Sequence, residues 1–408
     1  MHLLLKVKSF EQVIDKKRAF LYHLFAHFSC PHAIFIHSIP YIEKFHTNTI
    51  QKLPMSEENP EPSQLRNRLY SSLKRHPKRI VFTEGEDVRV LQAAAILVKE
   101  LIIAPILLGN KTVMKALALE HNIDTMFIHM LDPSTASDLP LFCERLQNIA
   151  KYQGKVIADP EELISRPHNF AAMMVQYGQA DGIVAGNQTP PSTISRAVTN
   201  FIKPLPDVPD IFGVVALTGP HLSHLGKDGI LFLADCSITP DPDVEALASI
   251  AIESGKLAHH LLGRPVRVAM LSHSTHESMV TTSSMKMKAA TALAREKVAE
   301  QMLEIEIEGE VSADVALDLA AAEIKLNDAA AYEPADVLVF PNLDAAHIAF
   351  KLLVHVAKAK CFGQLLMGVT RHAAQVPMTA SVDMITGTAA LVACESAKYR
   401  ELFPEDEG

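Results

Sequence analysis

The chain has 408 residues, 48% of them hydrophobic, and a formal net charge of −9 at pH 7. This length exceeds what one compact core usually fills, so two domains are expected, and the negative charge argues against a general nucleic-acid surface. The 5 cysteines lack C-x-x-C spacing, which indicates a reduced, cytoplasmic globular protein with neither a zinc site nor a disulfide framework.

Residues 1–54 differ in composition from the rest of the chain. Their run 19–42 contains no Asp, Glu, Lys or Arg, which superficially suggests a membrane anchor. Histidines and prolines interrupt this run, and no signal-peptide cleavage site is evident. The polar sequence from Met55 resembles a natural N-terminus. We therefore expect that the start was mis-assigned and that translation begins at Met55. A disordered extension is the second alternative, and a membrane segment is the third.

From residue 79 onward, short β-branched runs alternate with helical patterns. This rhythm predicts mostly parallel sheets covered by helices on both faces. The proline-rich stretch 204–210 is the stiffest linker-like segment and predicts a domain boundary. Helices are predicted at 90–101, 244–256, 284–302 and 345–358. Strands are predicted at 79–83, 105–108, 182–185, 212–217, 229–234, 266–272, 305–309, 337–341 and 364–369.

The stretch 232–243, Phe-Leu-Ala-Asp-Cys-Ser-Ile-Thr-Pro-Asp-Pro-Asp, is the most informative in the chain. An apolar run ends in Asp235, and a turn leads into the next helix. Asp241 is the predicted N-cap, with Pro242 at the first helical position. The free N–H groups of this helix would point at the carboxyl end of a strand, where open α/β sheets bind anionic ligands.

Four further blocks lie at predicted strand ends. They are 84–89, 180–186, 270–275 and a last one in two parts, 308–314 and 340–346. Together with 232–243 they resemble the phosphate acetyl/butyryl-transferase family, and also the phosphotransacetylase-like C-terminal domain of some malic enzymes. The resemblance implies an α/β fold with two three-layer α/β/α domains of the isopropylmalate-dehydrogenase-like type and an interdomain cleft. The domains implied are 55–207 with 366–408, and 208–365.

The resemblance also implies a reaction. Members of the family move an acyl group between coenzyme A and inorganic phosphate: a CoA thiolate attacks the carbonyl of an acyl phosphate, and phosphate leaves. Such a site needs a base near the thiol, cations on the phosphate and donors at the developing oxyanion. Coenzyme A and acetyl-CoA are then substrates, and neither a cofactor nor a metal is implied. The expected protein is a homodimer without nucleic-acid or membrane partners.

Two arginines carry this expectation. Arg196 corresponds to a family arginine that holds phosphate, and Arg89 falls where a second one stands. A guanidinium suits phosphate because it donates two parallel N–H bonds and stays charged. Each could instead be a surface arginine, or one paired with a carboxylate such as Asp87. Before Arg196, Pro191 takes the place of a small family hydroxyl, with Ser192 next to it.

The C-terminal block 368–385 departs from the family pattern G-L-x-K-P-V-x-D-L-S-R-G-x-S-V-x-D-I. Met378 replaces the catalytic arginine and Met384 replaces the aspartate proposed as base, so neither side chain can bind an oxyanion or take a proton. Asp383 lies one residue earlier. It either replaces the base, if the helix start shifts, or is a solvated carboxylate favoured by the helix dipole. Ser381 matches a serine of the family pattern and so fixes how this block aligns with that pattern.

The remaining candidates are polar residues at strand ends. Ser274 and Thr275 stand where relatives have a Ser- and Gly-rich loop, and the flanking His273 and His276 are weaker candidates for catalysis or a metal. A turn-and-cap role explains Asn342 nearly as well as ligand binding does. The predicted catalytic residues are Arg196, Asp383 and Ser381, and the predicted substrate-binding residues are Arg89, Ser192, Ser274, Thr275, Asn342 and Arg371, the last a replacement cation where the family has lysine.

Two functions of different class follow. One is an active phosphate acyltransferase acting on acetyl or another short acyl group. The other is a catalytically impaired acetyl-CoA-binding sensor on the same fold, which the methionines at 378 and 384 favour. The sequence shows no malic-enzyme domain that a sensor would regulate, which favours the enzyme. A nicotinamide-dependent dehydrogenase would need a Gly-rich fingerprint after the first strand, and none is found there. We expect the transferase.

Overall fold

The computed structural model describes residues 64–402, with gaps at 75–76, 153, 155, 223, 226–228 and 327–331. The expectations for residues 1–54 therefore lie outside the described residues. Residues from Glu61 onward form one compact unit. Among the described helices, none is both long and apolar enough to cross a membrane.

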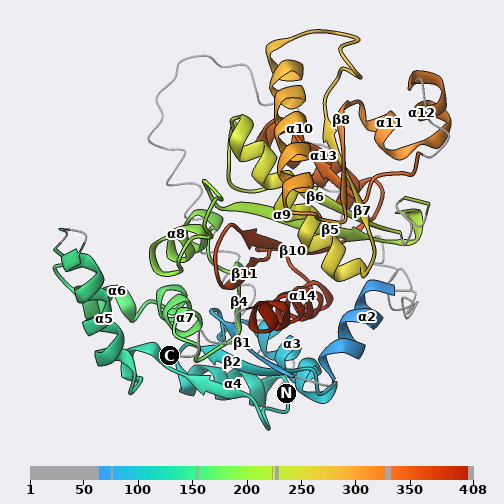
Figure 1. Ribbon diagram of the computed structural model, residues 1–408. Coiled ribbons are helices and arrows are strands. Elements are labelled where there is room, and N and C mark those ends of the chain that lie inside the picture. Colours follow the sequence, from blue (N-terminus) through green and yellow to red (C-terminus); the bar gives the residue numbers. More distant parts are fainter. Residues whose placement is uncertain are drawn as a thin grey trace, which may run out of the picture. The chain divides into compact units, whose positions relative to one another are not determined.

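A single sheet of eleven strands forms the centre of the described chain (Figure 1). Its strands in chain order are β1 (Lys78–Phe82), β2 (Ile103–Leu108), β3 (His129–Leu131), β4 (Gly182–Ala185), β5 (Phe212–Thr218), β6 (Ile230–Ala234), β7 (Val266–Leu271), β8 (Ile305–Val311), β9 (Val337–Val339), β10 (Lys360–Met367) and β11 (His372–Gln375).

The helices connect these strands. They are α2 (Gln64–Leu73), α3 (Val88–Lys99), α4 (Lys111–Glu120), α5 (Leu139–Tyr152), α6 (Pro160–Ile164), α7 (Pro167–Gln176), α8 (Pro191–Phe201), α9 (Val244–Leu262), α10 (Thr282–Glu300), α11 (Ala313–Leu317), α12 (Leu319–Lys325), α13 (Leu343–His355) and α14 (Val382–Leu402).

Strand direction divides the sheet into two sets. In the order β3-β2-β1-β4-β11-β10-β5-β6-β9-β7-β8, the first five strands run parallel to one another. The last four are also parallel to one another, but β10 and β5 are antiparallel to their neighbours. The two sets therefore point in opposite directions. We call the end where β1, β4 and β11 finish the first rim, and the end where β6, β7, β9 and β10 finish the second rim.

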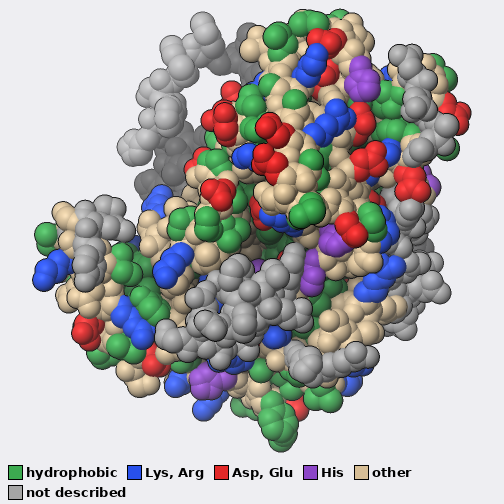
Figure 2. All heavy atoms as spheres, viewed as in Figure 1, with side chains coloured by type: hydrophobic (Ala, Val, Ile, Leu, Met, Phe, Trp, Pro, Cys, Tyr) green, Lys and Arg blue, Asp and Glu red, His purple; other side chains and the backbone are tan. Residues whose placement is uncertain are grey.

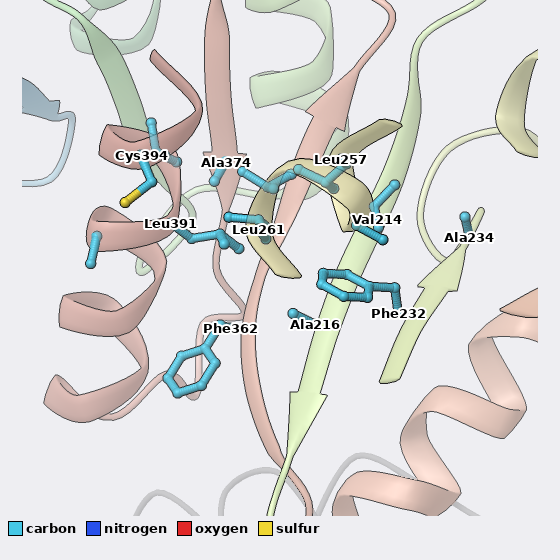
Figure 3. Close-up of a cluster of buried hydrophobic side chains, with 14 of the residues drawn as sticks. Val214, Ala216, Phe232, Ala234, Leu257, Leu261, Phe362, Ala374, Leu391 and Cys394 are labelled. Carbon is cyan, nitrogen blue, oxygen red and sulfur yellow. The ribbon is translucent and has the colours of Figure 1, made fainter. Parts of the chain in front are cut away.

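Apolar residues alternate between the two faces of the buried strands, as in sheets covered on both sides. On β5, Val214 and Ala216 belong to one core cluster, whereas Val215 and Leu217 belong to another. The first cluster extends along one face of both strand sets, under α3, α14, α9 and α10 (Figure 1). In Figure 3, side chains of α9 and α14 lie over the strands that carry Val214 and Ala374. Two further clusters cover the other face, so the layers are helix, sheet and helix.

Charged side chains of both signs are interspersed on the face of the molecule shown in Figure 2. Lysine and arginine lie among aspartate and glutamate over the upper part of that view, which carries α10. Within the described residues on this face, no continuous surface of a single charge sign is seen. On this face, positive charge for a polyanionic ligand is therefore supplied by individual side chains.

The α/β class predicted from the sequence is confirmed, and all nine predicted strands are present with shifted bounds. The short strands β3 and β11 were not predicted, because three or four residues such as His-Ala-Ala-Gln carry too little pattern. The domain boundaries at 207/208 and 365/366 remain a prediction.

Candidate functional site

The two strand directions separate the predicted site residues. Arg89 follows β1, and Ser381 and Asp383 follow β11, so these three belong to the first rim. Ser274 and Thr275 follow β7 and Asn342 follows β9, at the second rim. Arg371 precedes β11 and also belongs to the second rim, where it is half-buried. One helix, α8, starts from the first rim after β4 and leads towards β5, which begins at the second rim.

Arg89 is fully engaged inside the protein. Its Nε and Nη2 donate to the Asp87 carboxylate at 3.1 and 2.6 Å, and these hydrogen bonds raise the pKa of Arg89 above its ordinary value. Nη1 donates to the carbonyls of Met378 and Ala380, both at 2.9 Å, and Nη2 donates to that of Asn187 at 3.3 Å. A guanidinium has five N–H donors, and these contacts use all of them. The pairing with Asp87 weighed from the sequence is observed, and Arg89 holds the 376–381 loop against the end of β4.

We expect Arg89→Lys to destabilise the fold. An ammonium group cannot reproduce five planar donors, and two or more carbonyl or carboxylate contacts are lost. A loss of roughly 2–4 kcal/mol in the free energy of unfolding follows from about 1–2 kcal/mol for each lost contact. Denaturant unfolding measures it. Arg196→Lys is the matched control and should leave the midpoint unchanged; equal midpoints for both variants would mean that Arg89 does not hold the loop.

The start of α14 is built from capping and ion pairing. The Ser381 hydroxyl accepts a hydrogen bond from the Met384 N–H at 3.2 Å, so it caps the helix. Asp383 lies in the first turn, where its carboxylate contacts Arg66 Nη1 at 2.8 Å and Lys360 Nζ at 3.7 Å. To serve as a base it would have to leave these cations. The geometry is that of the solvated helix-start carboxylate weighed from the sequence, and the catalytic role remains a prediction.

The two methionines of this block occupy different surroundings. Met378 is 56% exposed, and only its backbone carbonyl is used, by Arg89. Met384 packs against two of the core clusters and fills apolar volume there. A charged residue would therefore be accepted at position 378 and would be costly at position 384.

The exposed face of α8 brings two predicted residues together. Ile194, Ala197, Val198 and Phe201 form its buried stripe. Ser192, Arg196 and Thr199 follow one another at i, i+4 and i+7, so they share a face, and all three are exposed. Arg196 makes no hydrogen bond or ion pair with the described residues. Its guanidinium is available to an anion.

A cavity of about 460 Å³ lies at the end of this face. Thr199 and Ile202 line it from α8, Gly368 and Val369 from the end of β10, and Ile238 from the turn after β6. The remaining lining residues are Pro204, Val208, Pro209, Asp210, Ile211, Thr239 and Pro240. The proline-rich stretch predicted as a linker is thus one wall of the cavity.

Asp235 organises the turn on the opposite wall. Its buried carboxylate accepts backbone N–H bonds from Gly213 at 2.8 Å, Ser237 at 2.8 Å, Ile238 at 3.2 Å and Thr239 at 2.7 Å. The anion that satisfies these N–H groups is therefore part of the chain. The anion site expected at the N–H groups of the following helix, α9, stays a prediction.

The prediction that Asp241 is the N-cap of the following helix is wrong. Asp243 caps α9 by accepting from the Ala246 N–H at 2.8 Å. Asp241 instead lies two residues earlier and pairs with Lys286 on α10. Both residues fit the sequence preference for a cap, and the preference for proline at the first helical position pointed to Asp241, whereas Pro242 lies before the helix.

The second-rim candidates are engaged in local structure. The Ser274 hydroxyl donates to Glu310 at 3.2 Å, and Thr275 shares a 2.9 Å hydrogen bond with the Ser312 hydroxyl. Asn342 caps α13 through the Ala345 N–H at 3.0 Å, which is the cap role weighed from the sequence. His276 pairs with Glu308 at 3.0 Å. Within the described ranges, no group of three or more His, Cys, Asp or Glu side chains could hold a metal ion.

Cys236, next to Asp235, is not a nucleophile. It is fully buried, and burial raises its pKa well above the ordinary value. Burial likewise raises the pKa of Cys361 to about 12. Thiols of this kind stay protonated and inaccessible.

Comparisons with known proteins agree with the motifs. The family profile described as Phosphate acetyl/butaryl transferase matches residues 64–393. A phosphate acetyltransferase of Acetivibrio thermocellus is 31% identical over 319 residues, which is 78% of this chain and 94% of that protein. The solved phosphotransacetylase of Staphylococcus aureus is similar with a TM-score of 0.73 and 31% identity, over 81% of this chain and 98% of its own. That of Streptococcus pyogenes gives a TM-score of 0.74 and 26% identity, over 82% and 98%.

Proposed function

We propose, from the premise that this chain belongs to the phosphate acetyl/butaryl transferase family, that it transfers an acetyl or other short acyl group between coenzyme A and inorganic phosphate. The reaction is acetyl-CoA + phosphate = acetyl phosphate + CoA. Towards acetyl-CoA, the thiol of CoA loses its proton and its sulfur bonds to the carbonyl carbon of acetyl phosphate. The bond from that carbon to the phosphate oxygen breaks, and the electron pair leaves with phosphate.

The observation that carries this proposal is Arg196. It is exposed, it has no partner among the described side chains, and it shares a face of α8 with Thr199, which lines the cavity. A guanidinium there can bind the phosphate through parallel N–H bonds and offset the charge that develops as phosphate leaves. Ser192, one turn earlier on the same face, supplies a hydroxyl donor.

The proposal also includes small-molecule CoA thioesters and phosphate as partners, a cytoplasmic location and a homodimer. Ile348 and Leu352 of α13 and Val356, which directly follows this helix, are exposed at intervals of four residues. Such a run of exposed apolar residues supports burial against another copy. Sedimentation of the purified chain tests the dimer.

The first experiment measures thiol release from acetyl-CoA on addition of phosphate, followed with a thiol reagent. Calorimetric titration of acetyl-CoA into the same sample measures binding. Phosphate-dependent turnover supports the transferase. Tight acetyl-CoA binding without turnover would instead support the sensor, which the relatives named as transferases do not favour.

We expect Met378→Arg to raise the turnover rate tenfold or more. The position is exposed, so an arginine fits, and it restores the cation that the family pattern places in this loop. Met378→Gln, of similar length but neutral, should leave the rate unchanged. Equal rates for both variants would show that position 378 no longer faces the reacting groups.

A further inference from the structure

We infer that the cavity at the end of α8 holds the acyl chain of the substrate, and that this enzyme prefers acyl groups of four or more carbons to acetyl. This inference rests on the proposed function. Ile202, Val208 and Ile238 become the residues that set acyl-chain length.

The placement of Arg196 orients the substrate. Residues three apart on a helix are neighbours, about 5–6 Å between their Cβ atoms, so Arg196 lies one turn from Thr199 at the cavity. In an acyl phosphate the carbonyl carbon bears the phosphate oxygen on one side and the acyl chain on the other. With phosphate at Arg196, an acyl chain that runs along α8 past Thr199 would reach the cavity.

The lining suits an aliphatic chain. Ile202, Val208, Ile211, Ile238 and Val369, with three prolines, offer apolar surface, and the polar side chains are limited to Thr199, Asp210 and Thr239. The pantetheine arm of CoA carries two amides that would need hydrogen-bond partners when buried. An alkyl chain needs none.

The size of the cavity exceeds what acetyl requires. A water molecule occupies about 30 Å³ in the liquid, so a group of three heavy atoms such as acetyl takes up on the order of 100 Å³. The cavity measures about 460 Å³. The cavity opens to solvent at the exposed Pro204, Pro209 and Pro240, so this volume is not enclosed on all sides. Each methylene beyond acetyl that lies against the buried Ile202 and Val369 would bury apolar surface there.

The walls are fixed before a ligand arrives. The Leu205 N–H donates to the Gly368 carbonyl and the Thr370 N–H to the Lys203 carbonyl, both at 2.9 Å, which joins the 203–205 segment to the end of β10. On the other side, Asp235 holds the N–H groups of Ile238 and Thr239. A preformed cavity discriminates by size, because its walls do not collapse onto a short chain.

The experiment compares kcat/KM for acetyl-, butyryl- and hexanoyl-CoA with phosphate. A buried methylene contributes about 0.8 kcal/mol, roughly a fourfold gain, so butyryl should exceed acetyl by roughly tenfold. Val208→Phe and Thr199→Phe narrow the cavity from a loop and from an exposed helix position. Both should lower the ratio of kcat/KM for butyryl-CoA to kcat/KM for acetyl-CoA tenfold or more. Asn200→Phe adds the same ring to α8 beside the cavity lining and should leave this ratio unchanged.

Two results would overturn the inference. One is a wild-type preference for acetyl. The other is an equal loss with all three thioesters in the narrowed variants, which would place the pantetheine arm in the cavity. If no thioester is turned over, the proposed function fails; calorimetric affinities of acetyl- and butyryl-CoA then still decide which chain the cavity prefers. Thr199→Phe keeps the test decisive if Val208→Phe does not fold.

Discussion

Arg196→Ala should lower kcat/KM for phosphate-dependent acetyl transfer by roughly 10²–10³, the usual cost of removing one preorganised donor to a developing charge. Nothing else in the fold should change, because the side chain is exposed and makes no hydrogen bond or ion pair with a described residue. Thiol release at several phosphate concentrations measures the effect and separates the loss in kcat from the rise in the KM for phosphate. Arg196→Lys should fall between wild type and alanine, since it keeps the charge and loses the planar pair of donors.

Lys203→Ala is the matched control for charge alone. Lys203 is exposed just after the end of α8, and only its backbone takes part in the hydrogen bonds found there. It should reduce kcat/KM by less than about threefold, as expected for a distant, screened charge. If Arg196→Ala and Lys203→Ala had equal effects, Arg196 would act only through the general field, and the phosphate would have to bind elsewhere.

Asp235→Ala is expected to destabilise the protein more than any other single change considered. It leaves the N–H groups of Gly213, Ser237, Ile238 and Thr239 without their acceptor, the first buried and the other three in a half-buried turn. Each unsatisfied group costs about 1–3 kcal/mol, so a loss of 4 kcal/mol or more is expected unless water enters. Denaturant unfolding, followed by circular dichroism, measures it.

Asp235→Asn separates shape from charge. Its amide keeps one oxygen acceptor but turns an N–H₂ group towards backbone donors, so we expect about half the loss found for alanine. A midpoint unchanged from wild type in Asp235→Ala would show that solvent replaces the carboxylate, and that this aspartate is not what fixes the cavity wall.

The sequence predicted the fold class and most strands, because runs such as 230–234 and 266–271 are apolar enough to identify buried strands alone. Asn342 and Arg89 were predicted to bind substrate, but the contacts found are those of the alternatives weighed from the sequence: a helix cap for Asn342 and pairing with Asp87 for Arg89. Both are local interactions within three residues, which the chain itself encodes.

What the sequence missed depends on residues far apart in the chain. The contacts of Arg89 with the carbonyls of Met378 and Ala380 cannot be read from either segment. The cavity likewise combines α8, the 204–211 segment and the end of β10. Asp235 was recognised as the centre of a motif, but its acceptor role towards Gly213 depends on the antiparallel pairing of β5 and β6.

The position of β11 has a consequence for how the protein is made. This strand pairs with β4 on one side and β10 on the other, although β4 is complete long before β11 is synthesised. During translation the edge of β4 that pairs with β11 therefore stays unpaired, while β5 to β9 can pair as they emerge. An unpaired strand edge invites association with other chains. A nascent chain that stalls before residue 372 should thus depend on chaperones in a way that the finished protein does not.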